Sequence, residues 1–319
     1  MTAQRNLKRR VRARAAKTGE SYVAALRHFR PTPTGADMPD TTQTTLRIAV
    51  AQSTVRDDPT DADGLRASAA EVRQLMKDAA DAGARLVHFT EGAICFPSKF
   101  VMSELGPDQV GPADWTKAQW AVIEEEQGQI AALAGELGIW VVIASVHRLP
   151  APTLPYNSLY VVSDQGTVAA RYDERTLSNT KITYMYSAGA TPVTFEVDGY
   201  RFGLALGMDA HFPEVFTGYE RLDVDGVLTS YESSGLPGRE TVATEVRGYA
   251  AANSYWISLA VPANPSGPYA GVIGPRGGWA ARCPADGMPA VAVTEIHRED
   301  TLSPLARDWR RRTRSRITY

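Results

Sequence analysis

The residues best suited to chemistry follow the ends of predicted buried strands, and the clearest case is the segment YRFGLALGMDAHFPEVF (200–216). It reads as a strand over 202–206 that ends in a sharp turn at Gly207. In α/β folds such a turn presents a residue to a crevice, and in many enzymes that residue is the nucleophile. Glycine adopts strained backbone readily, but it has no side chain that could react. The turn therefore predicts a crevice without a nucleophile of its own.

Charged side chains are expected around this crevice. Glu91 follows the strand predicted over 85–90, and Asp209 and His211 lie just beyond the turn. The loop over 173–189 (DERTLSNTKITYMYSAG) carries an unusual set of charges. Carboxylates and an ammonium group in one crevice suit proton transfer. Asp209 and His211 do not form a dense metal-ligand motif with the glutamates, so we predict no metal site.

Cys95 lies four residues after Glu91, in GAICFPSKF, on a loop that should border the same crevice. As a displaced nucleophile it would supply the thiol that the turn lacks. As a small buried side chain it would be inert, which is the commoner situation for a free cysteine. Both interpretations stay open at this point.

The elements that must position these residues predict an α/β fold. Apolar runs of strand length alternate with segments in which apolar residues recur at helical spacing, such as Leu65, Ala69, Val72 and Met76. Strands and helices alternate first, two hairpins follow, and a strand–helix–strand unit comes last, which favours mixed sheets with helices on one face. The predicted strands cover 46–52, 85–90, 139–145, 158–163, 167–172, 193–197, 201–206, 224–231, 255–262, 272–273, 280–281 and 290–296. The predicted helices cover 5–29, with a break at Thr18-Gly19, then 65–82, 115–137 and 240–253, and a short helix is predicted to start near 212–214.

Composition excludes several classes of protein. The 319 residues are 44% apolar and 22% charged, which suits one large globular domain or two small ones. No run approaches the roughly 18 apolar residues of a membrane span, and no apolar region of a secretory signal follows the basic start. Two cysteines make no disulfide framework, so we expect a cytoplasmic protein. Without a phosphate-loop motif or a convincing dinucleotide fingerprint, we expect no cofactor.

The net charge of −2 conceals an uneven distribution. Residues 1–30 contain nine Lys/Arg and one acid, and residues 307–316 contain six Arg and one acid. The remainder, 31–306, has 19 basic and 34 acidic residues, a net charge of −15. We predict a basic N-terminal arm and linker (1–45), a folded domain (46–300) and a basic C-terminal tail (301–319). The basic segments are either solvated tails or contacts to an acidic neighbouring subunit, and we do not expect nucleic acid to be a partner.

Six motifs, in their order and spacing, resemble the nitrilase, or carbon–nitrogen hydrolase, superfamily over residues 46–300. They are LRIAVAQ (46–52), LVHFTEGA (86–93), YNSLYVVSDQG (156–166), FGLALGMDAHFPEVF (202–216), YAAANSYWISLAVPA (249–263) and GVIGPRGGWAARCPADGMPAVAVTEI (271–296). The resemblance implies a four-layer α/β/β/α sandwich that forms homodimers or larger oligomers.

The family mechanism uses a glutamate base, a lysine that stabilises the oxyanion, a cysteine nucleophile and a second, supporting glutamate. The resemblance places the base on Glu91 in this sequence. It places the lysine on Glu174, the second glutamate on Lys181 and the nucleophile on Gly207. The charges at 174 and 181 are therefore exchanged, which keeps one acid and one base in the site. The nucleophile is missing.

Three hypotheses follow for the function. The first is an enzyme that works without cysteine, using acid–base chemistry by Glu91, Glu174 and Lys181 on a small amine- or amide-type metabolite. The second is a catalytically dead relative that binds a ligand or assembles with a partner. The third is a residual amidase- or nitrilase-type hydrolase that uses Cys95. Under each, we expect a small-molecule ligand and no membrane contact.

Overall fold

The structure is a computed structural model, and the residues it describes are 13–14, 17, 45–232 and 240–317. The chain divides into two units, Met1–Thr42 and Gln43–Tyr319, and the second carries the fold below. The predicted arm and linker over 1–45 lie almost entirely outside the described residues.

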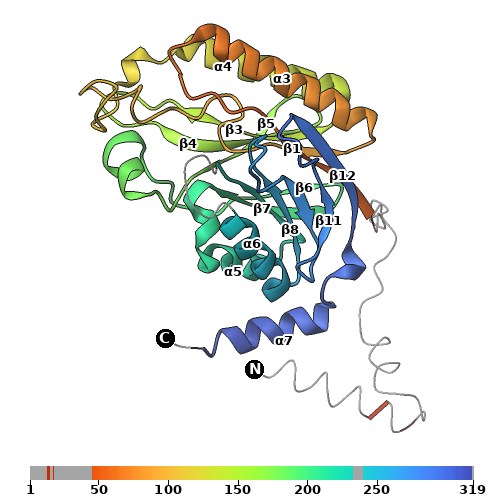
Figure 1. Ribbon diagram of the computed structural model, residues 1–319. Helices are drawn as coiled ribbons and strands as arrows, with labels where there is room; N and C mark the ends of the chain where they lie inside the picture. Colours follow the sequence, from red (N-terminus) through yellow and green to blue (C-terminus); the bar gives the residue numbers. More distant parts are fainter. Residues whose placement is uncertain (1–12, 15–16, 18–44, 233–239, 318–319) are drawn as a thin grey trace. The chain divides into compact units, whose positions relative to one another are not determined.

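Two mixed six-stranded sheets form the centre of the second unit within the described residues (Figure 1). The strand orders are β12-β1-β2-β3-β4-β5 and β11-β10-β9-β8-β7-β6. In the first sheet β1, β2 and β3 run parallel, and in the second β7, β8 and β9 do. The first sheet contains β1 (Thr45–Gln52), β2 (Leu86–His88), β3 (Trp140–His147), β4 (Tyr156–Val162), β5 (Val168–Asp173) and β12 (Ala290–His297). The second contains β6 (Thr194–Val197), β7 (Tyr200–Leu206), β8 (Gly226–Ser230), β9 (Trp256–Ala260), β10 (Gly271–Ile273) and β11 (Trp279–Arg282).

The main core lies between the two sheets, and strand β1 shows how the sequence builds it. Leu46, Ile48 and Val50 belong to the apolar cluster shared with β7, β8 and β9. Ala49 and Ala51 point to the other side and join the cluster shared with the covering helices. Because successive side chains of a strand point to opposite faces, an apolar run of this kind is buried on both sides.

Helices complete the layers (Figure 1). Helices α3 (Ala62–Asp81) and α4 (Trp120–Leu137) cover the first sheet, and α5 (Pro213–Arg221) and α6 (Glu240–Asn253) cover the second. The Asp61 side chain accepts from the Asp63 amide at the start of α3, and Gly138, with a φ of 64°, ends α4. The predicted α/β/β/α sandwich is confirmed.

The helix predicted over 115–137 is interrupted. Trp115–Lys117 form a short 3₁₀ turn (η1), Ala118 is extended, and α4 begins only at Trp120. The Asp114 carboxylate caps the turn by accepting from the Thr116 amide at 3.0 Å, and the Gln119 amide donates to the Pro59 carbonyl at 2.9 Å. Because these contacts hold the backbone in a turn before Trp120, the helix begins later than the apolar spacing alone predicts.

The C-terminal segment predicted as a tail contains a helix, α7 (Pro304–Arg314), which follows the short turn η4 (Arg298–Asp300). The Ser303 hydroxyl accepts from the Ala306 amide and so caps α7. The helix is held to the body by ion pairs of its arginines with acidic residues: Arg307–Asp223, Arg311–Asp223 and Arg314–Glu220. Opposite charge thus orders part of this basic segment within the chain.

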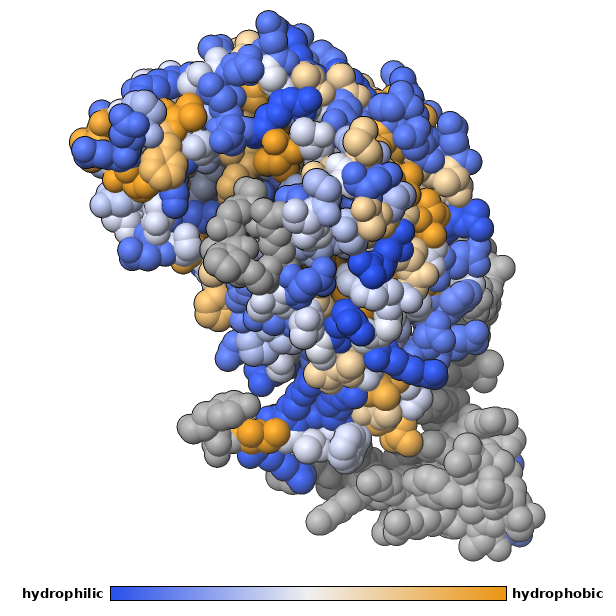
Figure 2. Space-filling view, in the orientation of Figure 1, coloured by the Kyte–Doolittle hydropathy of each residue, from blue (hydrophilic) through white to orange (hydrophobic). Residues whose placement is uncertain are grey.

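The surface offers no single apolar face in the view of Figure 2, where apolar residues are interspersed among hydrophilic ones. Within the described residues, no helix combines the length and the apolar character needed to cross a membrane.

His88, at the end of β2, links the two sheets. Its ring nitrogens lie 2.9 Å from Ser258 Oγ and 2.8 Å from Ser230 Oγ, and both serines belong to the second sheet. Burial lowers the pKa of His88 to about 3. The folded state therefore binds fewer protons here than the unfolded state below pH 6.5, and the free energy of unfolding must fall as the pH drops through this range.

The change His88→Gln should flatten this acid dependence. Each pH unit between 6.5 and the folded-state pKa of about 3 should cost the wild type roughly 1.4 kcal/mol through His88, or about 2 kcal/mol between pH 6.5 and 5. The variant should be less stable at pH 7 but should lose about that much less on going to pH 5. Urea unfolding of both proteins at the two pH values measures the difference. Equal losses would contradict a buried neutral imidazole.

Candidate active site

The carboxyl ends of parallel strands from both sheets meet at one place. Glu91 follows β2 of the first sheet, and Gly207 follows β7 of the second. Glu174 comes directly after β5, and Lys181 begins a five-residue π-helical turn, η2 (Lys181–Met185). Crevices at such strand ends are where α/β folds place binding sites.

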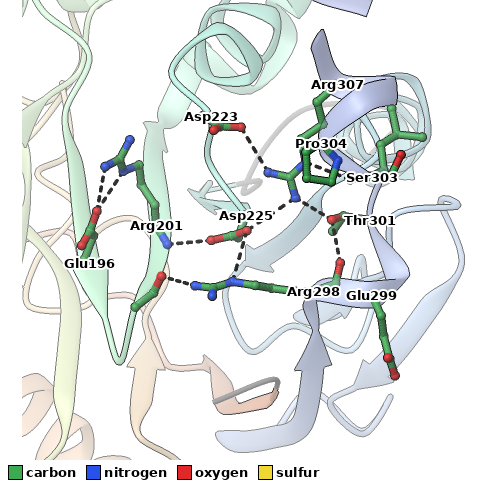
Figure 3. A pocket seen from close by; sticks show the side chains of 12 residues that line it. Glu196, Arg201, Asp223, Asp225, Arg298, Glu299, Thr301, Ser303, Pro304 and Arg307 are labelled. Atoms are coloured by element: carbon green, nitrogen blue, oxygen red, sulfur yellow. Dashed lines mark hydrogen bonds and ion pairs between the residues drawn. The ribbon is translucent and has the colours of Figure 1, made fainter. Parts of the chain in front are cut away.

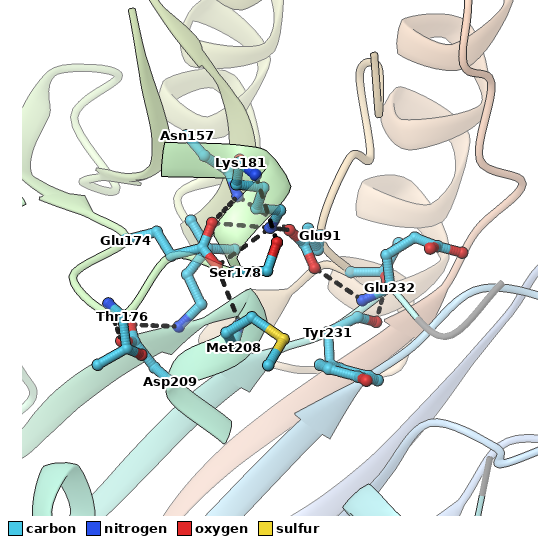
Figure 4. Close-up of polar contacts among 12 residues, drawn as sticks. Glu91, Asn157, Glu174, Thr176, Ser178, Lys181, Met208, Asp209, Tyr231 and Glu232 are labelled. Carbon is cyan, nitrogen blue, oxygen red and sulfur yellow. Dashed lines mark hydrogen bonds and ion pairs between the residues drawn. The ribbon is translucent and has the colours of Figure 1, made fainter. Parts of the chain in front are cut away.

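The ammonium of Lys181 lies between two buried carboxylates (Figure 4). Its Nζ donates to Glu91 Oε1 at 2.7 Å and to Glu174 Oε2 at 2.8 Å. The two glutamate side chains are 2% and 0% exposed, and the lysine side chain is 14% exposed. The structure thus brings together the three residues that the sequence suggested for acid–base chemistry.

Asn157, on β4, completes this cluster and was not singled out from the sequence. Its Nδ2 donates to Glu91 Oε1 at 2.9 Å and to Glu174 Oε2 at 2.7 Å. The Glu232 amide, just after β8, donates to Glu91 Oε2 at 2.8 Å. Side chains of the first sheet are therefore held in part by backbone of the second, which makes the site dependent on the packing of both sheets.

Gly207 occupies the turn after β7 with a φ of +56°. A Cβ atom at this position would lie 2.3 Å from Glu174 Oε1 and 2.9 Å from Lys181 Nζ. The same Glu174 oxygen accepts from the Met208 amide at 2.9 Å. The Glu174 carboxylate therefore fills the space in which a side chain at position 207 would have to sit, and it uses the donors there.

Burial and the neighbouring charges shift the pKa values of Glu174 and Lys181. Burial raises the pKa of Glu174 to about 7; the Lys181 ammonium opposes this shift and the Glu91 carboxylate adds to it. Burial alone would lower the pKa of Lys181, but Glu174 and Glu91 outweigh it and raise that pKa well above its ordinary value. The neighbouring carboxylates thus favour the charged form of Lys181, while burial brings the pKa of Glu174 close to neutral pH.

Asp209 does not face the cluster as a free acid. Its carboxylate is fully buried and accepts from the Tyr172 hydroxyl at 2.5 Å, from the Thr176 amide at 3.0 Å and from the Leu206 amide at 3.2 Å. These donors come from three segments, so Asp209 fixes the 3₁₀ turn η3 (Gly207–His211) against the loop that carries Glu174.

His211, at the end of η3, has partners of its own. Nδ1 lies 2.7 Å from Glu245 Oε2 on α6, and Nε2 lies 3.0 Å from the hydroxyl of Tyr231, which directly precedes Glu232. His211 and Asp209 were predicted to line the pocket around Glu91, Glu174 and Lys181 (the Glu–Lys–Glu cluster), but the hydrogen bonds of their side chains go to other residues. Among the described residues, no three His, Cys, Asp or Glu side chains gather closely enough to hold a metal ion.

Cys95 lies in the hydrophobic core with the residues of α3 and α4, and it is 3% exposed. Burial raises the pKa of its thiol, and the charges of Asp57 and Asp58 add to the shift. A thiol in this setting is a poor nucleophile because its reactive thiolate form is disfavoured.

A separate cavity of about 620 Å³ lies between the β6–β7 turn and α7 (Figure 3). Its arginines are engaged with carboxylates in the pairs Arg201–Glu196, Arg298–Asp225 and Arg307–Asp223. The cluster of Glu91, Glu174 and Lys181, in which burial and neighbouring charges shift the pKa of Glu174 and of Lys181, is the better candidate for chemistry.

Comparison with known proteins agrees with this fold. A family model described as carbon-nitrogen hydrolase matches residues 47–303. Among solved structures, an amidase from Nesterenkonia sp. has a TM-score of 0.64 at 18% identity, covering 83% of this chain and 96% of the amidase. A double mutant of an amidase from Nesterenkonia sp. AN1 in complex with acrylamide has a TM-score of 0.61 at 19% identity, and the match covers 86% of this chain and 100% of the amidase. The NitFhit protein of C. elegans has a TM-score of 0.68 at 18% identity, and the match covers 85% of this chain and 64% of NitFhit. No curated protein sequence gives a significant match.

The packing at Gly207 can be tested by Gly207→Ala, with Gly138→Ala as the matched control. Both glycines have a positive φ, but a Cβ at Gly138 would have no atom within 4 Å apart from those of the adjoining chain. Both variants should carry backbone strain of about 1–2 kcal/mol. Gly207→Ala should cost about 1–3 kcal/mol more, because the new methyl group overpacks the site.

In a Glu174→Ala background the excess cost of Gly207→Ala should shrink, since the carboxylate that blocks the methyl group is gone. Denaturant unfolding of all variants measures these differences. If Gly207→Ala were no more destabilising than Gly138→Ala, Glu174 would not fill the space at position 207.

Proposed function

The chain belongs to the carbon–nitrogen hydrolase family, and we propose that it is an enzyme of this family that works without a cysteine nucleophile, by proton transfer on a small amide- or amine-type metabolite. The observation that carries the proposal is the position of the Glu174 carboxylate. It lies against the Gly207 backbone, shares the Lys181 ammonium with Glu91, and has a pKa raised to about 7.

Acyl transfer to residue 207 is the reaction that this arrangement argues against. Gly207 has no nucleophilic atom, and the Glu174 oxygen fills the nearby space. The Lys181 ammonium and the Met208 amide, which are donors of the kind that stabilise an oxyanion, already bind that carboxylate. Loss of the nucleophile costs on the order of 10⁶ in rate in a comparable covalent hydrolase. A route through a thioester at this turn is therefore not part of the proposal.

Proton transfer suits the groups that remain. A carboxyl group with a pKa near the working pH can both take and give a proton, which is the condition for efficient general acid–base catalysis. We assign this role to Glu174. Lys181 would stabilise negative charge on the substrate, and Glu91 would hold Lys181 in place and share its charge. Elimination, cyclisation, isomerisation or direct attack by water needs only these roles.

The substrate class rests on likeness to relatives. An amidase of the same fold is known in complex with acrylamide, which shows that this fold can hold a small amide. A cluster of two carboxylates and one ammonium also offers acceptors for the N–H groups of an amide or amine. We therefore propose small amides and amines as the first compounds to test.

A second candidate is a ligand-binding protein without catalysis. The observation that favours it is that Glu91, Glu174, Lys181 and Asn157 are bonded to one another and to backbone amides, so the cluster is complete without a ligand. The Cys95 hydrolase has weaker support, because the thiol is buried in the core and its pKa is raised.

Two conservative changes test the acid–base role. Glu91→Gln and Glu174→Gln keep the shape of the side chain and remove its basic carboxylate. With a panel of small amides and amines followed by NMR, any turnover should fall by about 10²–10⁴ in each variant. Glu126→Gln is the matched control, because Glu126 is a buried, ion-paired glutamate on α4 that lies outside the cluster.

Turnover that survives both changes would rule out the acid–base assignment. Binding of a panel compound without turnover would instead favour the second candidate.

A further prediction concerns reconstruction of a thiol site. Gly207→Cys alone should not form an acyl-enzyme, because Glu174 fills the space and places negative charge where an oxyanion would develop; one lost oxyanion contact costs roughly 2.7–4 kcal/mol. The triple change Glu174→Lys, Lys181→Glu and Gly207→Cys restores the four roles of the family mechanism. It should acylate with activated esters or small amides, seen by mass spectrometry as an adduct on the introduced thiol. Acylation of the single variant at the rate of the triple variant would refute the assignment of position 174.

A further inference from the structure

We infer that the outward face of helix α7 is a contact surface for α7 of a second copy of this chain, with the two helices antiparallel. The outward face consists of Leu305, Asp308, Trp309 and Arg312. These residues are spaced three and four apart, so their side chains lie along one side of the helix. The inference concerns assembly and is independent of the proposed function.

The opposite side of α7 is held by the body of the same chain. Its ion pairs go to Asp223 and Glu220, and Arg314 Nη1 also donates to Asn253 Oδ1 at 2.7 Å. The arginines in these contacts stand at positions 307, 311 and 314, which share one side of the helix. The contacts therefore fix the rotation of α7 and leave the outward face pointing away from the domain.

The outward face exposes side chains of the kinds that protein interfaces bury. Leu305 is 77% exposed, more than any other large apolar side chain among the residues that the structure describes, and Trp309 is 61% exposed. The Asp308 side chain is 62% exposed, and Arg312 is also exposed. Tryptophan and arginine are the residues most often found to carry the binding energy of an interface. This composition favours a docking surface.

The outward face is complementary to itself. Its N-terminal half carries one carboxylate and two apolar side chains, whereas its C-terminal half carries Arg312 and is followed by Arg316. A two-fold axis between positions 309 and 312 brings the guanidinium of Arg312 in each copy to the Trp309 ring and the Asp308 carboxylate of the other. Such contacts combine cation–π and charge attraction. A parallel pair would instead place like charges opposite each other.

A second copy fits this face better than an anionic surface does, because an anionic surface would meet Asp308 as well as Arg312. The size of the helix limits the strength of the contact. An 11-residue helix is about 16 Å long, so one helix from each copy buries less than the roughly 1,200 Å² of a standard interface. We therefore expect this contact to add one association step of micromolar affinity.

Sedimentation velocity of the full-length protein from about 1 to 200 µM tests the role of Trp309. Trp309→Ala should weaken the association step by about tenfold or more, since the exposed indole is the largest group of the outward face. Met288→Ala is the matched control, because Met288 is equally exposed (61%) but lies outside α7. It should leave the distribution of masses unchanged.

Charge reversal tests the antiparallel pairing. Asp308→Arg and Arg312→Asp each place like charges opposite each other in a pair of identical chains, so each variant alone should lose the association step. An equal mixture of the two variants should regain it, because one chain then carries only positive charge at these positions and the other only negative. A charge pair within one helix cannot produce this recovery, and recovery also shows that both variants fold.

The inference is overturned if Trp309→Ala has the same distribution of masses as the wild type at every concentration, which includes a wild type that stays monomeric throughout. It is also overturned if the mixture of the two charge variants fails to associate where the wild type does. Loss of the step in Trp309→Ala and in both single charge variants, with its return in the mixture, is the result that we expect.

Discussion

One ammonium group shared by two buried carboxylates determines how this site is built. Lys181 Nζ contacts both Glu91 and Glu174, which have almost no exposed surface. Without the lysine, two like charges would face each other in a medium that solvates them poorly, and breaking such a buried pair costs about 3–5 kcal/mol. The remaining oxygens of the carboxylates must also be satisfied, and Asn157 and two backbone amides do this. The glycine at position 207 follows from the same requirement, because only a residue without Cβ leaves room for Glu174.

The same constraint joins the site to the fold. The donors to Glu91 and Glu174 include amides at the ends of β7 and β8, whereas the glutamates themselves follow strands of the other sheet. His88 makes a similar link deeper in the core through serines of β8 and β9. Polar contacts between the sheets are directional, so they fix how the sheets sit on each other more narrowly than apolar packing does. A site assembled in this way is preorganised by the core.

The sequence predicted the layers and the central residues but only part of their surroundings. Apolar runs located the strands, and the turn at 198–199 joined β6 and β7 as expected, with Asp198 and Gly199 both at positive φ. Glu91, Glu174 and Lys181 were found through motif order. Asn157 was missed although it lies in one of the quoted motifs, because an amide within a strand shows no pattern that distinguishes a buried hub from a surface residue. Asp209 was expected in the pocket, but its carboxylate accepts hydrogen bonds from Tyr172, Thr176 and Leu206 and so stabilises the turn η3. Helix α7 was not predicted, because the contacts that hold it are ion pairs between its arginines and acidic residues that lie far away in the sequence.

The central claim is that Glu174 exchanges a proton near neutral pH while Lys181 stays charged. It is tested most directly by ¹³C NMR of protein labelled at the glutamate carboxyl carbon, with Glu174→Gln used to assign the resonance. We predict one carboxyl signal that titrates near pH 7, that is absent from Glu174→Gln, and that shifts to a lower midpoint in Glu91→Gln, where the neighbouring negative charge is removed. A Glu174 signal that stays fully ionised from pH 8 down to the ordinary range of glutamates, near pH 4.3, would contradict the claim.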